Sequence, residues 1–319
     1  MNNNIDMYAL TQATYSGPLT FARRPEDREL AAADIAVVGV PFDMGTTYRP
    51  GARFGPRAVR EQSVFVGQYP WGHWPWDFNL YEDVRVVDWG DVPNTVFWQG
   101  YPDRMVDEVR RSVAAIHAAE VSVLALGGDH MVAYPLLAAA AEQHGPLSLV
   151  HFDAHSDTWD MGGDLNHGTM FRLAAEEGWV VPEHSVQVGM RTPNPDTCGF
   201  RVVDADELLD RPLDDTVAEI RERVGDRPVY LSFDVDFLDP AYVPGTGTPV
   251  VGGPSPREAR KLLRGLAGLR VVAADVVEVA PHLDPTATTA ITAATIGLDL
   301  LHLLALGRRA GGARQDGSV

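Results

Sequence analysis

Residues 147–157 have the sequence LSLVHFDAHSD, an apolar run followed at once by three potential metal ligands. The run Leu147–Phe152 predicts a buried β-strand. Asp153, His155 and Asp157 alternate with other residues, so in an extended segment their side chains project to one side. The stretch therefore predicts a strand of a buried sheet that ends in a cluster of ligands.

Two other segments repeat this arrangement. GGDH at 127–130 follows the apolar run 121–126, and DVD at 234–236 follows the apolar run 229–233. Four carboxylates gathered in one place repel one another unless something positive neutralises them, and oxygen mixed with imidazole suits Mn²⁺. Together the three segments predict a two-metal hydrolytic site.

Apolar, β-branched runs alternate with helical patterns along the whole chain. The predicted strands are Ile35–Val40, Val84–Val87, Val121–Leu126, Leu147–Phe152, Ser185–Val188, Arg201–Val203, Val229–Phe233 and Val271–Ala274. The predicted helices include Asp103–Ala119, Val132–Gln143, Thr216–Val224 and Thr288–Leu306. Such alternation predicts an α/β fold, a three-layer α/β/α sandwich with a mainly parallel sheet of about eight strands. Ligands of open parallel sheets bind at the carboxyl ends of the strands, where all three acidic segments fall.

The chain shows no domain linker or internal repeat, and 45% of its residues are apolar, which is enough for a sizeable core. We expect an N-terminal arm over residues 1–30 and a single catalytic domain over 31–308. Residues 309–319, rich in Gly and polar residues, are expected to form a flexible tail.

A formal net charge of -18 argues against binding to nucleic acid or to anionic membranes, because phosphate backbones demand a basic surface. It mildly favours a small cationic substrate. The single cysteine, Cys198, excludes an intramolecular disulfide and fits a reducing cytoplasm. Neither a signal peptide nor an uninterrupted membrane-spanning run is evident, so we expect a soluble cytoplasmic protein.

Several other chemistries are disfavoured. Lys261 is the only lysine, which makes Schiff-base and P-loop chemistry poor fits, and the Gly-x-Ser-x-Gly, His-Glu-x-x-His and Gly-x-Gly-x-x-Gly motifs are missing. A calcium loop that starts at Asp234 would need Gly where Asp239 stands and Glu where Gly245 stands. Chemistry on a transition metal is the better account.

Taken together, the motifs resemble the ureohydrolases, the arginase and agmatinase family, and most closely the agmatinases. The resemblance covers nearly the whole chain and implies the arginase-type α/β fold, a pair of Mn²⁺ ions per subunit and a homo-oligomer of three or six subunits. The motifs that carry it are GVPFD at 39–43, RPGARFGP at 49–56, GGDH at 127–130, HFDAHSD at 151–157, HGTMF at 167–171, SFDVDFLDP at 232–240 and DVVEVAP at 275–281.

The resemblance assigns six metal ligands, of which two bridge the ions. One ion is assigned to His130, Asp153, Asp157 and Asp234, and the other to Asp153, His155, Asp234 and Asp236. Two divalent cations balance the four carboxylates, and a water between them would serve as the nucleophile that attacks a guanidinium carbon to give urea and an amine.

Further roles follow from the same resemblance. Asp157 would relay a proton to the leaving nitrogen, His167 would transfer protons, and Glu278 would bind the planar guanidinium. Without the family pattern, Glu278 could equally be a buried structural acid and His167 an inert loop histidine. Thr246 would line the pocket floor or only shape a turn, and His151 is assigned to sheet structure.

The substrate is less well specified. The loop 158–166 lacks the Ser/Thr-rich stretch with which arginases read an amino-acid carboxylate, so free arginine is disfavoured. Asp160 and Asp164 in this loop could face a distal amine, which favours agmatine, hydrolysed to putrescine and urea; both could equally be solvated. The aromatic segment 68–78 is expected to pack rather than to shape the pocket.

Three alternatives stay open. An amidinohydrolase of 4-guanidinobutanoate or of another, possibly bulkier, guanidino substrate would need a cation for a substrate carboxylate. Arg191, Arg49, Arg53 or Arg57 could supply it. A deacetylase-like enzyme would use one zinc ion and fewer carboxylates. A non-catalytic binding module built around the arginine-rich loop belongs to another class altogether.

Overall fold

The computed structural model describes residues 17–67 and 73–315. Their strands form one eight-stranded sheet with the order β2-β1-β3-β8-β7-β4-β5-β6, and every neighbouring pair is parallel. The strands are β1 (Ile35–Val40), β2 (Val86–Asp91), β3 (Ser122–Gly127), β4 (Ser148–Phe152), β5 (Val186–Met190), β6 (Arg201–Asp204), β7 (Val229–Asp234) and β8 (Val271–Val277). Each coincides with a predicted strand to within a few residues, so the predicted parallel α/β fold is confirmed.

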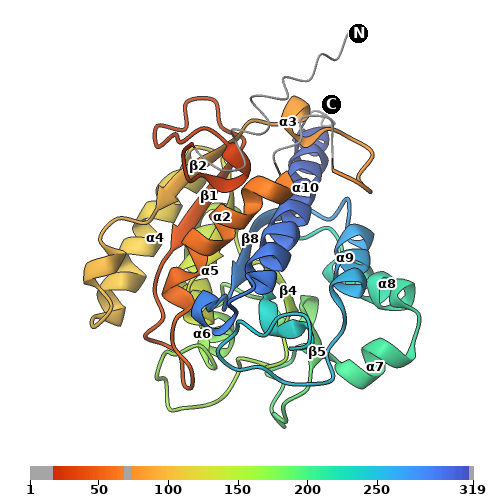
Figure 1. Ribbon diagram of the computed structural model, residues 1–319. Coiled ribbons are helices and arrows are strands. Elements are labelled where there is room, and N and C mark those ends of the chain that lie inside the picture. The colour runs from red at the N-terminus through yellow and green to blue at the C-terminus, as the bar shows by residue number, and fades with distance from the viewer. Residues whose placement is uncertain (1–16, 68–72, 316–319) are drawn as a thin grey trace.

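Helices cover both faces of the sheet (Figure 1). Side chains of successive β1 residues enter different apolar clusters: Ile35 and Val37 pack into one, and Ala36, Val38 and Val40 into the other. The first cluster includes residues of α2 (Gly55–Gly67), α7 (Ala205–Asp210), α8 (Leu213–Val224), α9 (Pro256–Gly265) and α10 (Thr288–Gln315). The second includes residues of α4 (Pro102–Ala118), α5 (Ala133–His144) and α6 (Met170–Glu176). A sheet buried on both faces has this three-layer form because each strand presents alternate side chains to opposite sides.

Some elements differ from the expectation. Helix α2 follows the arginine-rich loop and was not predicted, because Gly55 and Pro56 at its start suggest a loop, although Pro is well tolerated in the first helical turn. The short helix α3 (Leu80–Asp83), together with α6 and α7, was also not predicted.

The chain termini also bear on the predicted domain limits. Phe21 and Ala22 lie within the segment predicted as a surface arm, yet both are fully buried in the cluster that contains α2 and α10. Helix α10 continues to Gln315, beyond residue 308 where the catalytic domain was expected to end. Residues 1–16 and 316–319 lie outside the described part of the chain.

Helix α10 is the longest helix of the described chain and is largely apolar. By length and composition its segment Thr288–Arg309 could cross a membrane, but 78% of the most apolar window is buried inside the fold. It packs against α2 and β8. Burial of this kind is what a core helix of an α/β fold requires, since it leaves little apolar surface for lipid.

The aromatic segment 68–78 also packs on α10, as far as it is described. Trp76 stacks on His302 at 4.8 Å between ring centroids, and its indole Nε1 donates to Asp299 at 2.7 Å. Phe78 meets the same histidine ring edge to face. The packing expected for this segment is therefore present at Trp76 and Phe78, while residues 68–72 lie outside the described part.

A histidine pair between α4 and α5 predicts acid sensitivity of the fold. Burial, together with the neighbouring His144, lowers the pKa of His117 from 6.5 to about 3. The folded state thus favours the neutral ring, so its full stability holds above pH 6.5 and declines as the pH falls toward 3. At pH 5 this group alone lowers the free energy of unfolding by about 2 kcal/mol relative to pH 8.

We expect His117→Phe to reduce this loss, measured as the drop in Tm between pH 8 and pH 5. His184→Gln, at an exposed position, is the control and should leave the drop unchanged. An equal drop in wild type and His117→Phe would contradict the assignment.

Candidate metal centre

The three predicted ligand segments meet at the carboxyl edge of the sheet. His130 begins the short 3₁₀ helix His130–Val132 just after β3, and Asp234 is the last residue of β7. Asp236 lies in the 3₁₀ helix Val235–Phe237, and Asp153 follows β4 directly. Strands β3, β8, β7 and β4 are consecutive in the sheet, so their ends bring residues together that are more than 100 positions apart in sequence.

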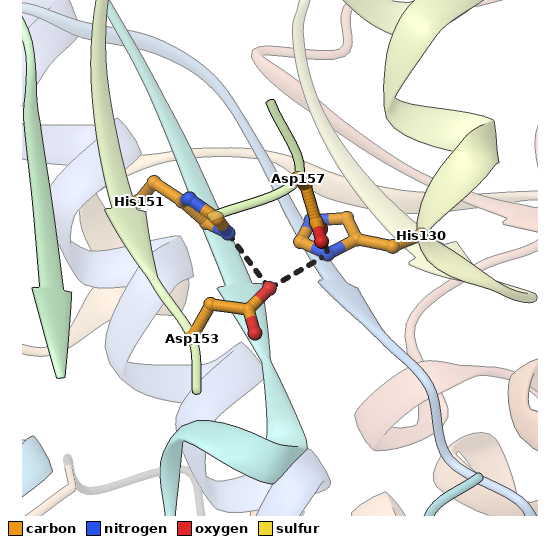
Figure 2. A group of neighbouring side chains, drawn as sticks. All are labelled: His130, His151, Asp153 and Asp157. Atoms are coloured by element: carbon orange, nitrogen blue, oxygen red, sulfur yellow. Dashed lines mark hydrogen bonds and ion pairs between the residues drawn. The ribbon is translucent and has the colours of Figure 1, made fainter. Parts of the chain in front are cut away.

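His130 faces three carboxylates, of which Figure 2 shows Asp153 and Asp157. Its Nδ1 lies 3.0 Å from an oxygen of Asp153, 2.9 Å from Asp157 and 3.3 Å from Asp234. His130 and Asp153 are almost fully buried. One imidazole nitrogen is thus surrounded by carboxylate oxygens from three separate segments.

A second group adjoins the first through Asp153. Nδ1 of His155 lies 3.3 Å from Oδ1 of Asp153 and 3.1 Å from Oδ2 of Asp236. Asp153 thus turns one oxygen to each histidine, the arrangement expected of a bridging ligand. The ligand atoms form two overlapping sets within which a metal ion could be held.

Hydrogen bonds behind His130 fix which of its nitrogens carries the proton. Oγ of Ser232 lies 2.7 Å from Nε2 of His130 and donates its only hydrogen to Oδ1 of Asp275 at 2.7 Å. Ser232 can therefore only accept from His130, which places the histidine proton on Nε2. In the neutral ring Nδ1 carries a lone pair directed at three carboxylate oxygens, and it forms no hydrogen bond with any described residue. Burial opposes a charge on His130, but these carboxylates raise its pKa well above the ordinary value, so a positive charge is favoured at this point. A cation at this point converts that repulsion into coordination, so the residues fit a metal ion.

Charge at the cluster gives the same result. Burial, together with Asp236 and Asp153, raises the pKa of Asp234 well above its ordinary value. Burial and Asp153 likewise raise the pKa of Asp157, and they raise that of Asp236 to about 6. Buried carboxylates that resist ionisation in the bare protein become stable anions once divalent cations lie between them.

His151 also contacts this cluster, although the sequence assigned it to sheet structure. Its Nε2 lies 2.8 Å from Oδ2 of Asp153, and its Nδ1 lies 3.1 Å from the side-chain amide nitrogen of Gln187. Because that amide nitrogen is a donor, Nδ1 accepts, and Nε2 donates to Asp153. His151 therefore orients the carboxylate of Asp153. Its position in the strand did not indicate this contact.

Glu278 and His167 form a second polar unit beside the cluster. Oε1 of Glu278 accepts from the backbone N–H of His130 at 2.8 Å and lies 3.0 Å from Nδ1 of His167. The other ring nitrogen, Nε2, lies 2.7 Å from the Thr47 hydroxyl. Burial opposes a charge on His167, but Glu278 raises its pKa to about 9. Oε2 of Glu278 accepts no hydrogen bond from the described residues, and it stays available to a ligand.

Two of the acidic residues have strained backbones. Asp157 has φ 52° and Glu278 has φ 64°, in the left-handed region that residues with a Cβ rarely adopt. Each such residue costs about 1–3 kcal/mol and persists where the surrounding structure holds it. The strain lies at the site and aims both carboxylates inward.

A cavity of about 160 Å³ opens onto the cluster, and one of the five predicted substrate residues lines it. His167 lines it, whereas Asp160 and Asp164 are exposed outside it and Glu278 and Thr246 lie beneath the surface. The sequence did not indicate several of its walls. The lining residues are Thr47, His130, His155, Asp157, Trp159, Met161, Asn166, His167, Gly168, Asp234 and Thr248.

Three of these missed residues lie in segments that the sequence had marked as part of the site. Thr248 belongs to the Gly-Thr-Gly-Thr-Pro segment in which Thr246 was selected, and its hydroxyl lies 3.2 Å from Oδ2 of Asp236. Trp159 and Met161 belong to the loop 158–166, in which the sequence predicted Asp160 and Asp164 instead. Both segments were predicted correctly, but residue type alone did not show which of their side chains point into the cavity.

An all-parallel α/β sheet with two overlapping carboxylate and imidazole sets at its carboxyl edge defines a metal-dependent hydrolase of the arginase type. The model of the Arginase family matches residues 33–302, and the chain belongs to this family. It is a ureohydrolase, a hydrolase that acts on a C–N bond of a guanidino group.

Similar proteins agree with this membership. The agmatinase of Photorhabdus laumondii is 47% identical over 292 residues, which cover 92% of each chain, and that of Proteus mirabilis is 48% identical over 290 residues, 90% of this chain and 91% of that one. Among solved structures, a hypothetical agmatinase from Burkholderia thailandensis has a TM-score of 0.88 at 46% identity, over 93% of this chain and 94% of that chain. Proclavaminate amidino hydrolase from Streptomyces clavuligerus has a TM-score of 0.86 at 40% identity, over 92% of this chain and 99% of that chain.

We predict that Ser232→Ala weakens metal binding by about 10–100-fold, because the proton of His130 loses the acceptor that keeps Nδ1 free. The measurement is titration of metal-depleted protein with Mn²⁺ against a competing chelator. Ser148→Ala removes an equally buried hydroxyl from β4 and should leave the affinity unchanged. Equal affinities for wild type and Ser232→Ala would refute the proposed tautomer.

Proposed function

We propose that this protein hydrolyses agmatine to putrescine and urea with two Mn²⁺ ions. The six ligands are His130, Asp153, His155, Asp157, Asp234 and Asp236. The names of its similar agmatinases support the substrate. The main structural support is that no Arg or Lys is among the residues that line the cavity.

Three of the four arginines considered for a substrate carboxylate are engaged elsewhere, and the fourth, Arg57, is exposed on α2 and does not line the cavity. Arg191 donates to four backbone carbonyl oxygens, those of Gly189, Asp236, Phe237 and Val250. Arg49 donates to the carbonyls of Thr246 and Gly247 at 2.7 and 3.0 Å, and Arg53 pairs with the buried Asp43. A carboxylate on the substrate would therefore meet acidic groups with no Arg or Lys to pair with, which disfavours 4-guanidinobutanoate.

Each remaining residue has an assigned role. The metal pair, when bound, supplies a nucleophile at neutral pH by lowering the pKa of water. Glu278 holds the guanidinium through its free Oε2, while its Oε1 keeps His167 in place. His167 is the proton-transfer residue, because it both lines the cavity and bonds to Glu278. Asp157 relays a proton to the leaving nitrogen.

The cavity mouth fits the rest of agmatine. Trp159 and Met161 form a partly exposed apolar wall, at 42% and 54% exposure, that suits a chain of methylenes. The indole ring offers its negative face to a distal ammonium. Asp160 and Asp164, exposed on the same loop, add only a long-range attraction.

We further propose a cytoplasmic location, an assembly of three or six subunits, and a single catalytic domain over residues 31–308.

The first test compares urea release from agmatine, 4-guanidinobutanoate, arginine and a bulkier guanidino compound by the Mn²⁺-loaded protein. We expect kcat/KM for agmatine to exceed that for 4-guanidinobutanoate by about 100-fold, since an uncompensated buried charge costs about 3 kcal/mol. Preference for 4-guanidinobutanoate or for the bulkier compound would overturn the assignment of agmatine. Absence of urea from every substrate would overturn the catalytic proposal itself.

A second test concerns the distal ammonium. We expect Trp159→Leu to raise KM for agmatine by about 3–30-fold with a smaller change in kcat, because a cation–π contact contributes about 0.5–2 kcal/mol to binding. Met161→Leu, which keeps an apolar side chain in the same wall, should behave as wild type. A KM unaffected by Trp159→Leu would show that the indole ring makes no cation–π contact with the distal ammonium.

A further inference from the structure

A second cavity, remote from the metal cluster, lies between α9 and α10. Its volume is about 390 Å³, and it shares no lining residue with the cavity described above. Three arginines of α9, Arg257, Arg260 and Arg264, line one side. Their spacing of three and four residues places them on one face of the helix.

Two of the three guanidinium groups have no acidic partner. Arg260 donates to both oxygens of Asp299, at 2.6 and 3.2 Å. Arg257 and Arg264 form no ion pair with any residue in the described part of the chain. Burial, and repulsion from Arg260 and Arg257, lower the pKa of Arg264, although Asp299 opposes this effect. The groove therefore carries two uncompensated positive charges in a chain whose net charge is -18.

One of the three arginines is held in place. Asp299 is 1% exposed and accepts a third hydrogen bond, from the indole of Trp76, so that Arg260 is held by a buried and fully occupied carboxylate. Guanidinium groups match the oxygens of phosphate in a bidentate geometry, so Arg257 and Arg264, which have no acidic partner, are the groups that can bind an anion.

The opposite side of the groove is of mixed character. Ile291, Thr292, Thr295 and Ile296 of α10 line it, and Pro75 and Pro256 add apolar surface. Trp74 lies at the rim with 89% of its surface exposed, which is unusual for the largest aromatic side chain. The ring and the prolines offer flat surfaces on which a planar ligand could stack.

We propose that the α9–α10 groove binds a small phosphorylated ligand with a flat, apolar body, of the chemical class of a nucleoside monophosphate. The phosphate lies between Arg257 and Arg264, and the ring lies against Trp74 and Ile291. The size of the cavity is in the range of small-molecule sites. This site is separate from the catalytic cavity and does not depend on the proposed substrate.

Equilibrium binding to the metal-loaded protein tests the proposal with three probes: AMP, adenosine and inorganic phosphate. AMP combines charge with a ring, whereas each of the others supplies only one of these features. We expect AMP to bind at least about tenfold more tightly than either of them, and its affinity to fall with added salt.

Variants locate the site. Arg264→Gln and Arg257→Gln should each weaken AMP binding by about tenfold, the loss of one charge-assisted pair. Lys261→Gln removes one positive charge from the same helix, outside the groove, and should leave binding unchanged. Urea release from agmatine without AMP serves as the check that each variant is folded.

Any of three outcomes would overturn the proposal. In the first, AMP fails to bind at millimolar concentration; in the second, wild type and Arg264→Gln bind AMP equally; in the third, AMP binds no more tightly than phosphate does. A change in oligomeric state on Arg257→Gln or Arg264→Gln, without loss of AMP binding, would show that the groove is a subunit contact.

Discussion

Mutual repulsion among four buried carboxylates is the constraint on which this structure depends. Asp153, Asp157, Asp234 and Asp236 converge at one edge of the sheet, and the lone pair of His130 Nδ1 points among them. No Arg or Lys lines the cavity to offset their charge. Divalent cations would complete such a site, so the fold must keep these carboxylates in place while they still repel one another.

The sheet provides this support through contacts behind the ligands. Ser232 and Asp275 lie side by side in β7 and β8, and with Tyr230 they form a buried hydrogen-bonded unit that fixes the proton of His130. Arg191 places its charge on the far side of the site, where it donates to the backbone carbonyl of Asp236. That position partly offsets the negative charge without closing the cavity to a cationic substrate. The positive charge thus stabilises the ligands from behind and leaves specificity to the open face.

The strands and the ligand segments could be predicted from patterns that recur along the sequence. Contacts that depend on the direction of a side chain could not. Strands were found because buried parallel strands are continuous apolar runs, and the ligand segments were found because they follow those runs. Helix α2 was missed because Gly55-Pro56 suggests a turn. His151 was assigned to the sheet because its contact with Asp153 depends on a tautomer fixed by Gln187, 36 residues away.

The substrate loop shows the same limit. Asp160 and Asp164 were chosen for their charge, but a carboxylate on an exposed loop is fully stabilised by water and has little reason to turn inward. Trp159 and Met161 lose unfavourable contact with water when they line a cavity, and Asn166, whose side chain accepts from Gly168, keeps the loop folded. Apolar rather than charged side chains of this loop therefore line the mouth of the site. A cationic substrate is attracted by the acidic groups at the base, and the wall needs only to be apolar and aromatic to accommodate its chain. This arrangement selects a cation although the exposed acids of the loop do not line the cavity.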